Sequence, residues 1–198
     1  MINLNDSSFD AKEVKIFNGG VAGIVNNVTV SLEKKKPEDK EKAPDYKVIF
    51  TDESGASCNT SFYYVTEPTQ YATVEKQIAN QGKVLKHLLH AVISPSFQFP
   101  QFDTPKAMLD GCMMTLKQNA VQGAKFRIFC NYGSIQSPKQ FLQPRSWVPF
   151  IESMSVTESR LEVGKIDQME RIEADSQSGS ASTTSSSAAG SPASTDGW

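Results

Sequence analysis

The chain is poor in the residues that cross-link small proteins or hold metal ions. Its 198 residues include three cysteines, Cys58, Cys112 and Cys130, and only two histidines. The cysteines are odd in number, far apart and form no CxxC pair, so a disulfide framework or a zinc site is not expected. We predict that they are small buried hydrophobes and that the protein uses no metal or cofactor.

Long apolar runs and enzyme motifs are missing as well. No stretch approaches the roughly 20 apolar residues of a membrane span, and the polar start of the chain lacks the pattern of a secretion signal. No phosphate-binding P-loop, GxSxG nucleophile elbow or HExxH zinc motif occurs. We therefore expect a soluble intracellular protein that is not an enzyme.

Charge is unevenly distributed along the chain, although the formal net charge is only −2. Residues 1–150 carry 17 Lys and Arg against 14 Asp and Glu, a balance of +3, whereas residues 151–198 carry 3 against 8, a balance of −5. A mildly basic body joined to an acidic end is typical of proteins that bind a polyanion with the body and screen it with the tail.

Residues 46–65 predict two β-strands joined by one turn, and we expect the rest of the chain to pack on this hairpin. Tyr46, Val48 and Phe50 alternate with less apolar residues, which is the period of a strand with one buried face. Residues 52–55 supply the turn, and residues 58–65 form the return strand. Phe62 and Tyr64 lie on one side of the return strand and Ser61 and Tyr63 on the other, so at least one aromatic faces outward whichever face is buried. An outward ring beside Lys47 can stack on a nucleic-acid base.

A second hairpin is predicted upstream, with strands over residues 13–17 and 21–32 and Gly23 suited to a bulge or sharp bend. Residues 33–45, EKKKPEDKEKAPD, then form a charged loop. This loop is either a solvated surface connection or a flexible basic finger that reaches phosphates.

Apolar residues at helical spacing predict a helix that begins at Thr66 and ends near Ile93, and a second that begins at Thr104 and ends at Gly123. Residues 125–132, KFRIFCNY, predict a strand, residues 133–144 a loop, and residues 145–151 a closing edge strand. In the strand, Arg127 and Phe129 share the face opposite the apolar one, where a cation and a ring together suit single-strand binding. The alternative is an ordinary exposed strand with a partly buried Phe129.

The C-terminal part has little with which to build a core. Residues 158–175 predict a short solvated helix or linker, and residues 176–198 are rich in Ser, Thr, Ala and Gly, which favours disorder. The chain nevertheless ends in Trp198, an aromatic that has no use in a disordered tail unless something binds it.

The order of these elements, with segments such as KVIFTDESG, GKVLKHLLHAV and KFRIFCNYG, resembles the single-stranded DNA-binding proteins of bacteriophages. The resemblance implies a mainly β fold with a helical insertion, an OB-fold small β-barrel of about five strands and two helices. It divides the chain into an OB-fold nucleic-acid-binding domain over residues 1–155, an acidic linker or short helix over 156–175, and a disordered tail over 176–198.

The resemblance also implies a function and a set of site residues. The protein would coat single-stranded DNA without strong sequence preference during phage DNA replication, recombination or repair, in the cytoplasm of the infected bacterial host and away from membranes. Phage replication proteins would bind the tail through Asp196 and Trp198. The DNA-binding face would comprise Lys47, Tyr63, Lys125, Arg127 and Phe129, together with Trp147, which either stacks on a base or caps the core.

Two other functions fit the same sequence. One is a structural β-barrel protein of a phage virion, with the tail as a flexible spacer. The other is an accessory domain of an enzyme, whose nucleic-acid face is incidental. Salt separates them, because a coating protein loses DNA affinity steeply as salt is added, whereas a virion protein has no meaningful DNA affinity at any salt.

Overall fold

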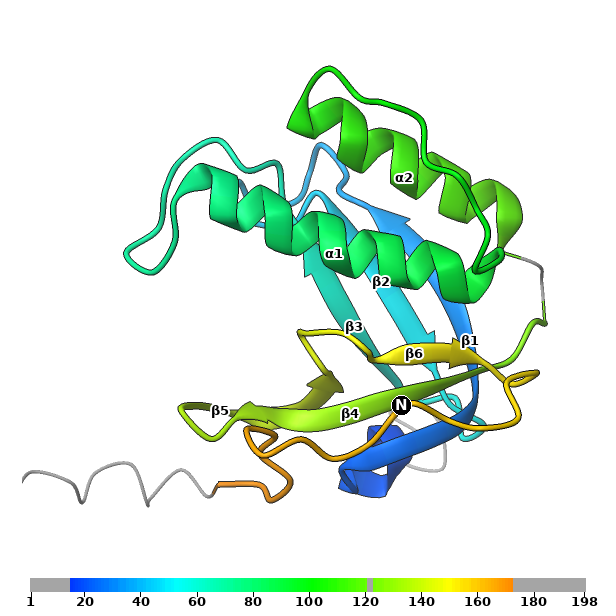
Figure 1. Ribbon diagram of the computed structural model, residues 1–198. Helices are drawn as coiled ribbons and strands as arrows, with labels where there is room; N and C mark the ends of the chain where they lie inside the picture. Colours follow the sequence, from blue (N-terminus) through cyan, green and yellow to red (C-terminus); the bar gives the residue numbers. More distant parts are fainter. Residues whose placement is uncertain (1–14, 121–122, 173–198) are drawn as a thin grey trace, which may run out of the picture.

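The computed structural model describes residues 15–120 and 123–172. Within these residues the chain forms six β-strands, two α-helices and one short 3-10 helix (Figure 1). The strands are β1 (Gly23–Lys34), β2 (Tyr46–Thr51), β3 (Ser57–Phe62), β4 (Phe126–Ser134), β5 (Ser137–Pro144) and β6 (Ile151–Ser153). The helices are α1 (Val74–Val92) and α2 (Pro105–Asn119), and the 3-10 helix is η2 (Phe17–Gly20). The mainly β fold with two inserted helices is confirmed.

The strands form one antiparallel sheet in the order β3-β2-β1-β4-β5, and β6 also pairs with β4. The two ends of this order approach each other, because β5 lies against β3. In the part of the chain that the structure describes, no hydrogen-bonded ladder joins β3 to β5. The sheet is therefore curled but is not closed into a barrel by hydrogen bonds.

The central hairpin forms as its alternation predicts. Tyr46, Val48 and Phe50 are buried, and β2 pairs with β3 over its whole length. The turn is held by Asp52, whose Oδ1 accepts from the backbone N–H of Ser54 at 2.9 Å, while Gly55 takes a φ of 82°. These local bonds explain why the hairpin could be read from the sequence.

Strand β1 pairs with two other strands, and a bulge separates the two paired parts. Residues 29–34 pair with β2, residues 23–28 pair with β4, and the register shifts between Val25 and Val28. Asn27 sits in the bulge with a φ of 59°. The sequence placed the bulge at Gly23, a few residues too early, and the strand predicted over 13–17 is wrong in its described part, where η2 begins at Phe17.

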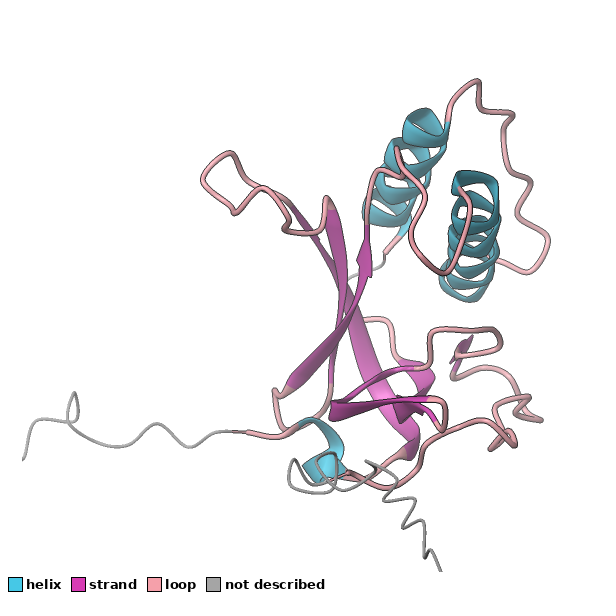
Figure 2. Ribbon diagram, turned by 90° about the vertical axis from the view of Figure 1, so that its left-hand side faces the viewer, coloured by secondary structure: helices cyan, strands magenta, loops and turns pink. Residues whose placement is uncertain are grey.

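The two helices lie side by side and cover the inner face of the sheet at its upper end, as Figures 1 and 2 show. Thr104 caps α2 by accepting from the N–H of Ala107, with Pro105 in the first turn, as predicted. Their buried residues are Leu85, Leu88 and Leu89 of α1 and Leu109, Cys112, Met113 and Leu116 of α2.

The predicted start of α1 and the predicted end of α2 were displaced. Helix α1 begins at Val74, after the N-cap Thr73, rather than at Thr66, because Thr69 and Ala72 close a tight turn first. Helix α2 ends at Asn119 rather than at Gly123.

A carboxylate on α2 ties the helix to the sheet. Asp110 Oδ1 accepts hydrogen bonds from the hydroxyls of Tyr46 and Tyr64, both at 2.6 Å, and Lys106 donates to its Oδ2 at 2.6 Å. Burial alone would raise the pKa of Asp110, but the bonds from Lys106 and the two tyrosines outweigh it and lower the pKa to about 2. The carboxylate therefore stays ionised, and the link persists, at neutral pH.

The chain after β4 differs most from its prediction. Residues 137–144, predicted as a loop, form β5, and the closing strand is confined to β6. Residues 156–172 contain no helix and are not a free linker, since Leu161 is buried and the backbone N–H of Tyr132 donates to the Gln168 carbonyl. All three cysteines are buried, as predicted. Neither of the described helices is long and apolar enough to cross a membrane.

Candidate nucleic-acid interface

The outer face of the β2–β3 hairpin is open and polar. Lys47, Ile49 and Thr51 alternate with the buried residues of β2 and so point away from the core. Their cross-strand partners on β3 are Ser61, Asn59 and Ser57, and those on β1 are Glu33, Ser31 and Thr29. Small polar side chains across three strands leave a surface on which an extended ligand can lie.

The β1–β2 connection, residues 35–45, borders this face and projects from the sheet on the side away from the helices (Figure 2). It encloses a hollow of about 330 Å³ with the ends of β1 and β2. The charged residues of the lining are five lysines and two acids: Lys34, Lys35, Lys40, Lys42, Lys47, Glu33 and Asp39. The balance of +3 makes the hollow attractive to phosphate.

Two acids near the hollow accept hydrogen bonds from backbone N–H groups. Asp39 Oδ2 accepts from the N–H of Lys36 at 2.7 Å, and Asp45 Oδ2 accepts from the N–H of Tyr64 at 2.7 Å. These bonds shape the loop and hold both carboxylates in place.

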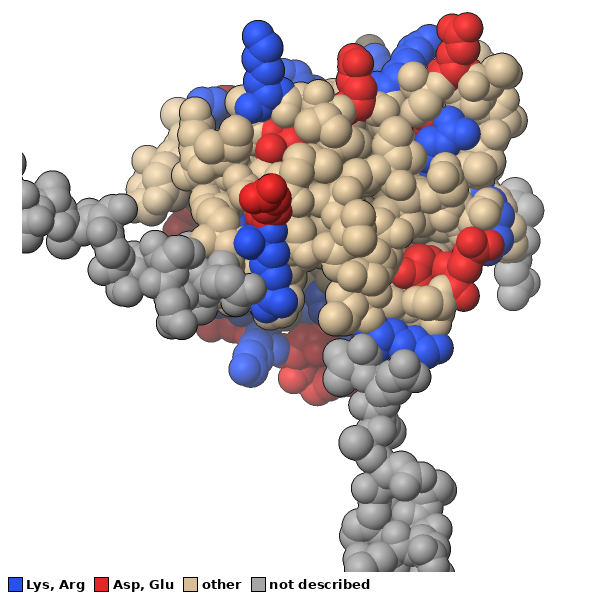
Figure 3. All heavy atoms as spheres, turned by 90° about the horizontal axis from the view of Figure 1, so that it is seen from below, with Lys and Arg blue, Asp and Glu red and all other residues tan. Residues whose placement is uncertain are grey.

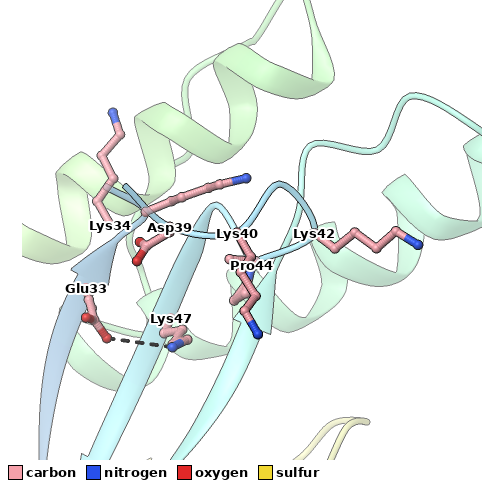
Figure 4. A pocket seen from close by; sticks show the side chains of 9 residues that line it. Glu33, Lys34, Asp39, Lys40, Lys42, Pro44 and Lys47 are labelled. Atoms are coloured by element: carbon pink, nitrogen blue, oxygen red, sulfur yellow. Dashed lines mark ion pairs between the residues drawn. The ribbon is translucent and has the colours of Figure 1, made fainter. Parts of the chain in front are cut away.

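The lysines of the lining differ in their contacts: Lys35 donates to the Glu41 carbonyl at 2.6 Å, and Lys34 lies over the Tyr46 ring. Lys47 faces Glu33 at 4.0 Å, with both side chains about half exposed, and such a surface pair is weak and screened by salt. In Figure 4, Lys40 reaches down toward the strand that carries Lys47, whereas Lys42 extends outward along the loop. The residues lining the hollow can therefore meet phosphates from more than one direction.

Tyr63 follows β3 directly and is 47% exposed. Its carbonyl accepts from the Gln81 side chain of α1 at 3.0 Å, which fixes the backbone that carries the ring. Because it lies two residues after Ser61, the cross-strand partner of Lys47, Tyr63 extends the same outer face. Lys47 and Tyr63 are thus outward and near each other, as the sequence predicted.

Phe129 does not belong to this surface. Its side chain is fully buried, and the guanidinium carbon of Arg145 lies 3.8 Å from its ring centroid. The prediction that Phe129 faces outward is therefore wrong. The reason is that residues 145–172 fold back over the outer face of β4, so that both faces of this strand are covered.

The other residues predicted for the DNA-binding face on and after β4 have different surroundings. Arg127 donates to Glu152 Oε1 at 2.8 Å and to Asn26 Oδ1 at 3.0 Å, and its side chain is only 17% exposed. A guanidinium held in this way has little capacity left for phosphate. Lys125 is exposed, one residue before β4. Trp147 is half-buried, and the guanidinium carbon of Arg145 lies 5.7 Å from its ring centroid.

A buried ion pair fastens the covering segment to β4. Arg145 and Asp167 are both buried and form a direct salt bridge. Asp167 Oδ1 also accepts from Asn131 Nδ2 at 2.6 Å, and its Oδ2 accepts from the N–H of Gly164 at 2.7 Å. Burial of this pair with further hydrogen bonds makes the cover of β4 part of the folded body.

Two exposed aromatic residues were missed by the sequence prediction. Tyr71 is 82% exposed and Phe141, on β5, is 76% exposed. Tyr71 fits the helical spacing of the residues after it, so it was counted in the apolar stripe of a helix that begins later. Phe141 alternates with the less exposed Leu142 in a segment predicted as a loop, and that alternation was the available signal.

The β4–β5 side of the molecule carries few charges, and in Figure 3 the Lys and Arg side chains are scattered among Asp and Glu. Its exposed side chains include Ile135 and Ile166, which are joined by a backbone hydrogen bond of 3.0 Å, and Val163. This side is better suited to apolar contacts than to phosphates.

The predicted tail residues, Asp196 and Trp198, lie outside the described residues. Among residues 15–120 and 123–172, no group of three or more His, Cys, Asp or Glu side chains could hold a metal ion. Comparison with protein-family models, with curated proteins and with solved structures finds no match to this chain.

Proposed function

We propose that this protein binds single-stranded DNA without strong sequence preference through the outer face of β2–β3 and the loop of residues 35–45. The observation that carries the proposal is the lysine-lined hollow, which continues onto a polar hairpin face that ends in the exposed ring of Tyr63. Lysines attract the phosphate backbone whatever the sequence, and a ring stacks on any base.

The topology supports an OB-type architecture for this function. OB-folds are five-stranded, partly open Greek-key barrels that bind oligonucleotides on the face of strands 2 and 3 and on the loop between strands 1 and 2. Here β5 lies against β3 at the far end of the order β3-β2-β1-β4-β5, and the hollow lies on the corresponding loop. We therefore propose an OB-fold in which β3 and β5 approach without pairing.

We extend the proposal to the cellular role that the sequence resemblance implies. The protein would coat single strands during phage DNA replication, recombination or repair in the infected bacterial host. Residues 196–198, at the acidic end of the chain, would be the contact for replication proteins.

The test is a titration of intrinsic fluorescence with oligo-dT at several salt concentrations. Affinity should fall steeply with salt, and Lys47→Ala and Lys40→Ala should each reduce the slope of log K against log salt by about one unit or slightly less. Lys165→Ala, which removes an exposed lysine of the segment that covers β4, is the matched control and should leave the slope unchanged. Equal slopes in all four proteins would refute the proposed interface.

The alternative function, a structural protein of a virion, is favoured by a different observation. Ile135, Val163 and Ile166 are each about half or more exposed, which suits contact with another protein. Under this alternative the protein has no oligo-dT affinity even at low salt, and Ile166→Glu disrupts an assembly that size-exclusion chromatography detects in the parent.

A further inference from the structure

Tyr71 is the most exposed large side chain among the apolar and aromatic residues in the described part of the chain, at 82%. It lies between β3 and α1, outside both elements. An aromatic ring gains nothing for folding when it is this exposed, because almost none of its surface is removed from water. A ligand that covers the ring would recover that contribution.

The ring is carried by a rigid turn. The N–H of Thr69 donates to the Ala72 carbonyl at 2.9 Å, and Thr69 Oγ1 accepts from the N–H groups of Tyr71 at 3.3 Å and Ala72 at 3.1 Å. Gln77 of α1 holds both ends of the segment, since its Nε2 donates to the carbonyls of Glu67 and Ala72, each at 3.1 Å. Little backbone freedom remains to be lost on binding.

Side chains of helix α1 hold the backbone near both Tyr71 and Tyr63. Gln77 holds the turn that carries Tyr71, and Gln81 holds the carbonyl of Tyr63 at 3.0 Å. These glutamines are four residues apart on α1, which is one helical turn or about 6 Å along its axis. The backbone segments that carry the two rings are therefore anchored to neighbouring turns of one helix.

The turn is flanked by two exposed acids, Glu67 and Glu75, and one exposed lysine, Lys76, so its net charge does not attract phosphate. Glu67 and Glu75 are exposed on either side of the turn, and hydrogen bonds from the α1 backbone and Thr73 lower the pKa of Glu75, so it stays ionised. Two carboxylates repel a phosphate but leave an uncharged ring available to the face of a base. The lysines lie in the loop of residues 35–45 and at Lys47 of β2, next to the end of β3 that Tyr63 follows.

We propose that Tyr63 and Tyr71 are two stacking platforms for neighbouring bases of one bound single strand, which leaves the hairpin past the end of β3 and passes over the turn before α1. The strand's phosphates are held by the lysines of the hollow, and its bases are held by the two rings. This inference rests on the proposed function and adds a binding subsite to it.

The test compares the parent with Tyr71→Ala, Tyr71→Leu and Tyr71→Phe in the oligo-dT titration. Because stacking on one ring is worth a substantial part of the binding energy, Ala and Leu should weaken binding about fivefold or more, and Phe less than about twofold. The salt slope should be that of the parent in all three, since no phosphate contact is removed. Met114→Ala, at an exposed position of α2, is the control and should bind as the parent does.

The outcomes separate the two proposals. A parent protein without oligo-dT affinity at low salt refutes the proposed function and this inference with it. If the parent binds oligo-dT, Lys47→Ala binds more weakly and Tyr71→Ala binds as tightly as the parent, only the role of Tyr71 as a second platform is refuted. Parent-like binding by Tyr71→Leu, or loss of binding in Tyr71→Phe, would refute stacking on the ring. Thermal unfolding of each variant verifies that the fold is retained.

Discussion

The outer faces of two strand regions, the β2–β3 hairpin and β4, look alike in the sequence and differ in the structure. Each carries a cation and an aromatic opposite an apolar face: Lys47 with Tyr63, and Arg127 with Phe129. Tyr63 remains 47% exposed, whereas Phe129 is fully buried. The alternation of a strand therefore tells which residues share a face, but not whether a later part of the chain covers that face.

The path of the chain beyond each strand accounts for the difference. After β3 the chain continues into the helices, which pack on the inner face of the sheet, and Lys47 and Tyr63 on the outer face of the hairpin are each nearly half exposed. After β5 it returns over β4, where Arg145 stacks on Phe129 and pairs with Asp167. The same combination of residues thus supplies a candidate ligand surface in one place and part of the core in the other.

The largest expected effect comes from removing the clamp on the covered face. Arg145→Ala leaves the Asp167 carboxylate buried without its cation, which should lower the free energy of unfolding by about 3–5 kcal/mol. Urea denaturation measures this loss. Lys165→Ala removes an exposed charge from the same segment and should change stability by less than about 0.5 kcal/mol. A small loss in Arg145→Ala would show that the cover of β4 contributes little to the fold.

Phe129→Ala should also act on stability. Truncating a fully buried Phe typically costs about 3–5 kcal/mol, and we expect the lower part of this range because the Arg145 guanidinium can move toward the space. Oligo-dT binding by the fraction that remains folded should equal that of the parent. A stable Phe129→Ala protein with weakened DNA binding would instead mean that the face of β4 opens and binds the ligand.

Tyr63→Ala tests the exposed face by the opposite pattern. Binding to oligo-dT should weaken by about 1–3 kcal/mol, because one stacking ring is lost. Stability should change little, because nearly half of the side chain is already in water. The measurements are the fluorescence titration and urea denaturation on the same sample, and the reverse pattern would exchange the roles of the two faces.

The smallest effect is a pH dependence of the segment that leads into β6. His87 Nε2 accepts from the backbone N–H groups of Phe150 at 3.2 Å and Ile151 at 3.4 Å, and burial lowers the pKa of His87 below its ordinary 6.5. As pH falls below about 6.5 the unfolded chain takes up a proton that the folded chain resists, so stability decreases toward the folded-state pKa.

His87→Gln is the variant that isolates this dependence, because its amide oxygen can accept the same bonds but does not titrate. The stability of the parent, measured in urea from pH 8 to pH 5, should fall relative to that of the variant only below about pH 6.5. Parallel curves over the whole range would assign no pH dependence to His87.

Elements with strong local signals could be predicted, and elements defined by distant contacts could not. The start of α2 was found because Thr104 and Pro105 form a cap within four residues of sequence. The start of α1 was placed too early because Thr69 closes a competing turn, and spacing alone cannot rank the two.

The candidate site divides in the same way. Lys47 and Tyr63 were expected outward because alternation leaves an aromatic of the hairpin exposed beside Lys47 and the family resemblance selects Tyr63. The burial of Phe129 depends on Arg145 and Asp167, and no local pattern shows that these distant residues meet on β4. Single-sequence reasoning therefore found the free face and misread the covered one.

The bulge at Asn27 determines which side chains of β1 point outward beside the hairpin. β1 is shared between two ladders, so the extra residue decides which side chains of residues 29–34 point inward beside β2. Deleting Asn27 would shift these residues by one position, turning Val30 and Leu32 toward solvent and Ser31 and Glu33 toward the core. By contrast, a deletion within residues 36–42 changes the lysine-lined hollow but leaves the register of β1 with β2 as it is. The chemistry of the open face thus depends on an asparagine outside it, and position 27 should tolerate length changes far less than the longer loop nearby.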